Sequence, residues 1–180
     1  MLLSLDISTS CTGWCVFDQN TFRDMGYINL SKHKGLFDKA TQIQAELTKI
    51  YKKYDVDEVV VEENLQAFRP GLSSAKTLMT LAQFNGVVCW ICYNSMKVPV
   101  HRMNVNSARK LVGLKINRKS KLTTKEQVLN HVSLLENSID WPTKVVSRGK
   151  FAGTTRVINE AYDMADAYVI GKSFLIEKSK

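Results

Sequence analysis

The sequence predicts an α/β fold, in which a mixed sheet of five strands, three antiparallel and then parallel strands, is flanked by helices on both faces. Two observations predict it. Three segments rich in β-forming residues, joined by short turns, fill residues 2–30 and suggest an antiparallel meander. Beyond them, short apolar segments alternate with segments of helical periodicity, which is typical of parallel strands covered by helices.

The expected elements follow in chain order. Strands are predicted at residues 2–7, 12–18, 21–30, 59–61 and 98–102. Helices are predicted at residues 35–54, 72–93, 107–112, 124–135 and about 159–176. The run at 59–61 is fully apolar and β-branched, which indicates a central strand buried on both faces. No repeat or linker interrupts the pattern, so we expect a single domain over residues 1–180.

Basic residues are concentrated in two runs that contain no acid, and the net charge is +8. The first run holds Arg109, Lys110, Lys115, Arg118, Lys119, Lys121 and Lys125. The second holds Lys144, Arg148, Lys150 and Arg156. Such runs can be solvated loops, but two of them in one basic chain favour a polyanionic partner, and nucleic acid is the first candidate.

Several protein classes fit the sequence poorly. No apolar run reaches the roughly 18 residues that span a bilayer, and Asp6 interrupts the N-terminal apolar segment, so we expect neither membrane insertion nor a signal peptide. A cytoplasmic protein is therefore expected. Cys89 and Cys92 have the spacing of a zinc knuckle but lie in an apolar segment, which favours buried, reduced thiols.

Two predicted strands end in carboxylates. Asp6 lies at the end of an otherwise apolar run, and Glu62 and Glu63 follow the run at 59–61. Asp6 also suits a turn, since aspartate is favoured there. If the two strands are neighbours, however, Asp6 and Glu62 converge at the carboxyl edge of the sheet, while strand geometry sends Glu63 to the opposite face.

The last predicted helix carries a second acidic pair. Asp163 and Asp166 are three residues apart and share one helical face with the apolar residues that should pack on the sheet. Favourable placement near the helix N-terminus is an alternative, but it explains Asp166 poorly because Asp166 lies two turns in. Buried acids are costly unless they are paired or bind metal. We therefore expect Asp6, Glu62, Asp163 and Asp166 to form one metal site.

Oxygen-only ligands of this kind favour Mg²⁺, with Mn²⁺ as a substitute. Beside a basic surface, the expected chemistry is two-metal phosphodiester hydrolysis. One ion would generate the hydroxide nucleophile, and the other would stabilise the leaving 3′-oxygen, with the ions roughly 4 Å apart.

On these residues the sequence resembles the RuvC-like Holliday junction resolvases of the RNase H-like superfamily, in a phage-type or divergent form. The matching segments, in the expected order, are LDISTSCTGW, VVVEE, LAQFNGVV, the run from RKLVG to TKEQVLNHV, and DMADA. The resemblance implies an RNase H-like fold, a homodimer that cuts four-way DNA junctions, and a bacterial cell or phage-infected host as its location.

The same resemblance implies individual roles. Asp6, Glu62, Asp163 and Asp166 would hold two divalent ions. The family also carries catalytic or DNA-contacting lysines on this basic segment, and Lys125 matches one of them, which makes it a catalytic candidate. A second family lysine falls at Arg109 or Lys110, and this choice stays open. Phe68 is the candidate for a DNA-stacking aromatic, with Arg69 beside it. The apolar helix at 72–93 would be either the dimer face or ordinary core.

The sequence departs from the family in places, and other functions are compatible with parts of it. Asp6-Ile7-Ser8 replaces the usual Asp-Pro-Gly, and residues 115–121 form a basic insertion, so strict junction selectivity is in doubt. An actin-like ATPase would need a second glycine-rich phosphate loop, which is missing. A related nuclease acting on branched DNA or RNA–DNA hybrids, or a non-catalytic junction-binding module, remains an alternative.

Overall fold

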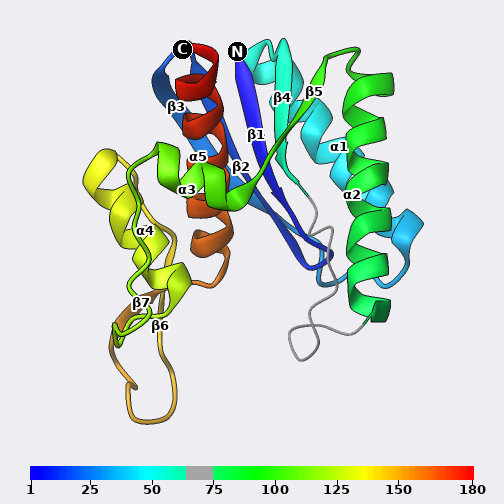
Figure 1. The fold of residues 1–180 in the computed structure, drawn as a ribbon. Helices are drawn as coiled ribbons and strands as arrows, with labels where there is room; N and C mark the ends of the chain where they lie inside the picture. The colour runs from blue at the N-terminus through cyan, green and yellow to red at the C-terminus, as the bar shows by residue number, and fades with distance from the viewer. Residues whose placement is uncertain (64–74) are drawn as a thin grey trace.

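A computed structural model of the chain describes residues 1–63 and 75–180, and its centre is a five-stranded mixed sheet (Figure 1). The strand order across the sheet is β3-β2-β1-β4-β5. The strands are β1 (Leu2–Ile7), β2 (Cys11–Asp18), β3 (Thr21–Asn29), β4 (Glu58–Glu62) and β5 (Val100–Met103). The predicted fold class is confirmed.

Strand direction changes at the central strand. β1 pairs with β2 in antiparallel fashion, and β2 pairs in the same way with β3. On its other side, β1 pairs in parallel with β4, which pairs in parallel with β5. The carboxyl ends of β1, β4 and β5 therefore meet at one edge of the sheet.

Helices cover both faces of the sheet (Figure 1). One face carries α5 (Glu160–Lys178), against which α3 (Val105–Leu111) and α4 (Thr124–Leu135) pack. The other face carries α1 (Leu36–Tyr54) and α2 (Ala75–Ser95). None of the described helices combines the length and hydropathy of a membrane-spanning segment.

Alternation along the strands divides the apolar core in two. Leu3 and Leu5 of β1 face α1 and α2, where they join a buried cluster with Ile43 and Leu47. Leu2 faces α5 instead. Ser4 and Asp6 have the parity of Leu2, so they also face α5.

The structure adds one element that the sequence analysis missed, a two-stranded hairpin of β6 (Thr143–Val145) and β7 (Thr155–Val157). Its strands are short and mostly exposed, so they lack the alternating apolar pattern that marks a half-buried strand. Glu62 belongs to β4 itself rather than following it, and the fifth strand begins at Val100 instead of Val98.

Candidate active site

Asp6 and Glu62 lie side by side on the α5 face of the sheet. In the parallel pair of β1 and β4, Leu5 is the partner of Val61, and the two acids come directly after these residues. Asp6 is part of β1, where it pairs with Gly13 of β2. The turn begins later, at Ser8, whose hydroxyl accepts a hydrogen bond from the Cys11 amide and donates one to the Cys11 carbonyl. Asp6 is thus a strand residue and not a turn residue.

Helix α5 brings Asp163 and Asp166 to the same place. Their side chains are only 17% and 13% exposed. The helix approaches the sheet closely at Gly13, where a Cβ atom would overlap the backbone carbonyl of Asp163. Because Gly13 is the cross-strand partner of Asp6, the missing side chain at residue 13 lets the backbone of Asp163 lie directly over the strand pair that holds Asp6.

A buried serine fixes α5 further along. The Ser4 hydroxyl is fully buried and lies 2.8 Å from the carbonyl oxygen of Ala167, to which it donates a hydrogen bond. Gly171 sits over the same serine, and a Cβ there would lie 2.5 Å from the Ser4 hydroxyl oxygen. Sequence reasoning missed the role of Ser4, because a small polar residue in a buried strand gives no signal of its own.

The four acids line a pocket of about 820 Å³. Its floor is the carboxyl edge of the sheet. One wall is formed by α4 and α5, including Lys125 and Tyr162, and the opposite wall by α2, including Leu78 and Asn85. Glu63 was expected on the opposite face, but it also lines the pocket, because β4 ends at Glu62 and strand alternation does not extend beyond it. A concave site with convergent polar groups between two helical walls is a common form of binding site.

Crowding of the acids perturbs their ionisation. Burial raises the pKa of Asp6 well above its usual range, and the charges of Asp166, Glu62 and Asp163 raise it further. Burial likewise raises the pKa of Glu62, with the charge of Asp166 adding to it. Burial also raises the pKa of Asp166, although Arg109 and Lys125 oppose this. Such a cluster favours a cation that neutralises it.

Two basic side chains contact the acidic cluster. Lys125 Nζ lies 2.9 Å from Asp163 Oδ1, and Arg109 Nη2 lies 3.6 Å from Asp166 Oδ1. Burial lowers the pKa of Lys125, but the hydrogen bond to Asp163 and the surrounding acids outweigh it, so the pKa is raised overall. Of the two candidates for the second basic position, Arg109 contacts Asp166, while Lys110 is exposed.

The α4 N-terminus holds Lys125 in place. Thr123 and Glu126 form a capping box, each bonding the other's backbone amide. These hydrogen bonds lower the pKa of Glu126. A lysine in the first turn opposes the helix dipole, so its position is unfavourable for the helix alone. Its contact with Asp163 supplies the compensating interaction.

The donor set suits a hard divalent cation. Four carboxylates meet at one pocket, and oxygen ligands are those that Mg²⁺ and Mn²⁺ prefer. Within residues 1–63 and 75–180, however, no three acidic, histidine or cysteine side chains have the spacing of an assembled metal cage. Lys125 and Arg109 instead neutralise two of the acids, so a cation would displace or adjust these ion pairs.

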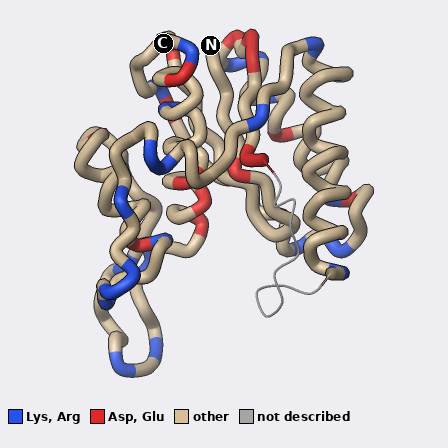
Figure 2. The backbone as a smooth tube through the Cα atoms, in the orientation of Figure 1, with Lys and Arg blue, Asp and Glu red and all other residues tan. Residues whose placement is uncertain are grey.

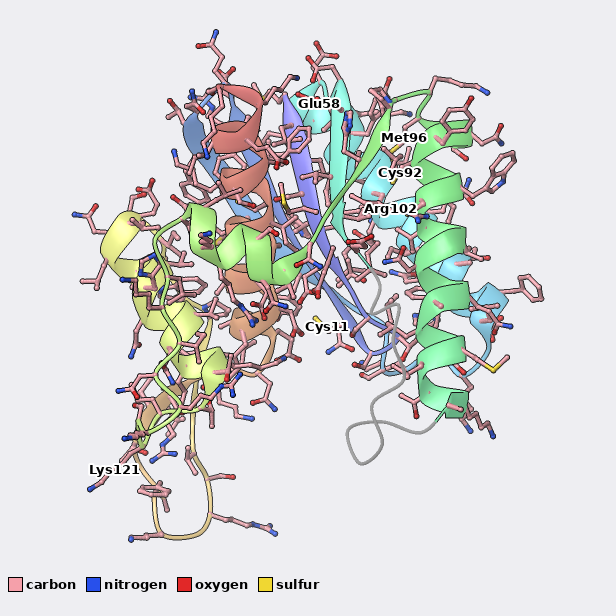
Figure 3. The ribbon with its side chains drawn as sticks, in the orientation of Figure 1. Cys11, Glu58, Cys92, Met96, Arg102 and Lys121 are labelled. Carbon is pink, nitrogen blue, oxygen red and sulfur yellow. The ribbon has the colours of Figure 1, made fainter. Side chains whose placement is uncertain are left out.

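The remaining predicted DNA-binding residues lie apart from the pocket. Lys115, Arg118, Lys119 and Lys121 are exposed on the connection between α3 and α4. Figure 3 shows Lys121 at the lower end of this part of the molecule, well away from Cys11, the first residue of β2. Phe68 and Arg69 lie outside the described residues.

Sequence comparison with family models and with curated proteins gives no match. Comparison of the structure with solved structures does give matches. A structure of T. thermophilus RuvC in complex with a Holliday junction substrate superimposes with a TM-score of 0.67 at 13% identity, over 99% of this chain and 94% of that one. A second Thermus thermophilus RuvC structure gives 0.63 at 15% identity, over 99% and 95% of the two chains.

The yeast mitochondrial Holliday junction resolvase Ydc2 is also similar, with a TM-score of 0.60 at 14% identity, over 99% of this chain and 78% of that one. At such low identity the likeness establishes a shared architecture. The resemblance that the sequence motifs indicated is therefore confirmed at the level of the whole fold: this chain has the RuvC-like, RNase H-like fold.

Proposed function

We propose that this protein is a divalent-metal-dependent endonuclease that resolves four-way DNA junctions. The observation that carries the proposal is the convergence of Asp6, Glu62, Asp163 and Asp166 on one pocket within a RuvC-like fold. The similar structures include RuvC bound to a Holliday junction substrate and the yeast Holliday junction resolvase Ydc2. The fold alone does not dictate an activity, so the acidic site is the stronger argument.

The four carboxylates would hold the divalent ions, preferably Mg²⁺, with Mn²⁺ as a substitute. When bound, these ions activate water and stabilise the leaving oxygen of a phosphodiester. Lys125 reaches into the pocket from α4 and would orient the scissile phosphate once its contact with Asp163 is released. In the overall step, water adds to phosphorus and the bond to the 3′-oxygen breaks, which leaves a 3′-hydroxyl and a 5′-phosphate.

Cutting two opposed strands of a junction requires two sites, and helix α2 offers a face for a second copy. One side of α2 is core, with Phe84 and Val88 buried. The other side exposes Met79, Trp90 and Tyr93 by 63%, 59% and 63%. The helix is thus both core and exposed apolar surface, and large exposed apolar patches commonly mark interfaces. We propose that this side of α2 forms a homodimer interface.

The test is Mg²⁺-dependent cleavage of a synthetic four-way junction beside linear duplex, a flap and an RNA–DNA hybrid. Wild type is compared with Asp163→Asn and with Glu177→Gln, a matched control at the exposed far end of the same helix. We expect paired symmetric nicks in the junction alone, lost in Asp163→Asn and retained in Glu177→Gln.

Other outcomes separate the alternatives. Comparable cutting of flaps or hybrids would indicate a general branched-DNA or hybrid nuclease with the same metal site. Junction binding without cleavage at any divalent ion would indicate a non-catalytic binding module. Sedimentation of wild type beside Trp90→Lys tests the dimer, and a monomer in both would contradict it.

A further inference from the structure

The β6–β7 hairpin is not used by the site described above. Its strands are joined by residues 146–154, with left-handed backbone at Gly149 and Gly153. The connecting loop extends beyond α4 at the lower end of the molecule (Figure 1). At its base, Trp141 and Val157 pack against the apolar core that α5 shares with α4. The hairpin is therefore anchored at one end and solvent-exposed along the rest of its length.

The hairpin is strongly basic and locally uncompensated. Residues 141–159 contain no acid and four cations: Lys144, Arg148, Lys150 and Arg156. All four are exposed, and in the part of the chain that the structure describes none of them forms an ion pair. Lys144 and Arg156 are direct cross-strand partners. Like charges placed opposite each other destabilise a hairpin that is already marginal by its size. An anionic ligand would offset this repulsion.

One cation is already held in position. The guanidinium carbon of Arg156 lies 3.6 Å from the centroid of the Phe151 ring, and Lys150 Nζ lies 5.8 Å from the same centroid. A guanidinium stacked on an aromatic ring loses less freedom when it binds a phosphate, and its planar donors suit phosphate oxygens. Phe151 thus orders a phosphate-binding group on an exposed loop.

The basic hairpin adjoins the candidate active site. Strand β7 ends at Val157, and Asn159, two residues further along the chain, lines the same pocket as Lys125. Residues 115–121 of the first basic run lie in the same part of the molecule, as the blue segments of Figure 2 show. A DNA strand leaving the pocket past α4 would meet cations on both segments.

We propose that the β6–β7 hairpin is a second DNA-binding element, which grips the phosphate backbone of a double-stranded arm of the substrate beyond the cleavage site. This inference rests on the proposed function for its substrate. Its recognition is electrostatic and independent of base sequence, since the loop presents cations and one aromatic ring already covered by Arg156.

The experiment measures equilibrium binding of a fluorescent four-way junction in Ca²⁺, as a function of salt. It compares wild type, Arg148→Gln/Lys150→Gln, and Phe151→Leu. The control, Lys49→Gln/Lys52→Gln, removes the same charge from exposed positions on α1, on the opposite side of the sheet.

Each lost phosphate contact should reduce the slope of log affinity against log salt by about 0.9. The loop double variant should therefore lose roughly 2 units of slope, and the α1 variant should not change. Phe151→Leu should weaken binding with little change in slope, because the charge remains but is less ordered.

Arm length separates the proposed contact from one at the crossover. When the junction arms are shortened stepwise, wild type should lose affinity until it equals the loop variant. If the two proteins differ equally at every arm length, the hairpin contacts the crossover and the assignment to an arm is wrong. Equal slopes for wild type and loop variant on long arms would overturn the inference, while junction cleavage by wild type would leave the proposed function standing. If wild type binds no junction at all, the proposed function fails first.

Discussion

The two faces of the central sheet differ in the side chains that they bury. The face under α1 and α2 is an ordinary apolar interface, with Leu3, Leu5, Ile43 and Leu47 fully buried. The face under α5 interrupts the same kind of core with Ser4, and it ends in a group of carboxylates at the pocket. Apolar burial stabilises the first face. On the second face, polar and charged side chains replace part of the apolar surface. This is the pattern expected where a functional site is built into a fold.

Among the substitutions that test this difference, Asp6→Asn should have the largest effect. Removal of one central carboxylate should reduce junction cleavage on the order of 10³-fold or more, because a donor set for divalent ions tolerates no neutral replacement at its centre. DNA binding should be kept or tightened, since repulsion of phosphate falls. Cleavage and binding are measured on the same junction. Strong residual cleavage would contradict the assignment of Asp6.

On the opposite face, Leu47→Ala should affect stability and leave the chemistry intact. Leu47 is fully buried in α1, so its truncation should lower the free energy of unfolding by about 2–5 kcal/mol. Urea denaturation measures the loss, with Phe37→Ala, on the same helix and 79% exposed, as a control expected to change little. At a temperature where the variant is folded, its cleavage rate should equal that of wild type. A lower rate would mean that the two faces are coupled.

A matched glycine pair sharpens the contrast. Gly13→Ala places a methyl group against the Asp163 carbonyl, so it should cost about 1–3 kcal/mol of stability. It should also reduce cleavage by about 10²-fold, because small displacements of catalytic groups are costly. Gly86→Ala on α2 meets no atom within 4 Å and should instead stabilise the helix by about 0.5–1 kcal/mol. Equal effects of the two substitutions would show that the close approach at Gly13 is unimportant.

The smallest effect is a pH dependence of stability in EDTA. Burial, together with the neighbouring acids, raises the pKa of Asp6 in the folded protein. The folded state then holds a proton that the unfolded chain releases above about pH 4, so the free energy of unfolding falls as pH rises through the raised pKa. Asp6→Asn should therefore melt a few degrees higher than wild type at pH 7.5, at about 2–4 °C per kcal/mol relieved.

The advantage of Asp6→Asn should shrink towards pH 4, where wild type is also protonated. Added Mg²⁺ should raise the melting temperature of wild type more than that of the variant, because a ligand of the folded state stabilises it by mass action. Differential scanning fluorimetry measures both effects. A variant less stable than wild type at pH 7.5 would argue against a strained carboxylate at residue 6.

Much of this arrangement could be predicted from the sequence, and the limits have physical causes. The acidic cluster could be predicted because strand and helix periodicity depend only on nearby residues. The two signals were acids at the ends of apolar strands and the three-residue spacing of Asp163 and Asp166. The choice between Arg109 and Lys110 depends on the exact phase of a seven-residue helix, which sequence does not fix. The close approach at Gly13 depends on a helix far away in the chain, and a three-residue exposed strand such as β6 leaves no periodic trace.

Helix α5 determines when, during synthesis of the chain, the acidic cluster can be completed. It packs on β1 and β2 from the beginning of the chain and supplies two of the four carboxylates. Because synthesis proceeds from the N-terminus and elements this distant in sequence join late, a nascent chain carries only half of the acidic cluster. Chains that stop short of Asp163, or misfold before α5 docks, should be inert towards DNA. An incomplete copy of the proposed nuclease therefore lacks the site that would cut DNA.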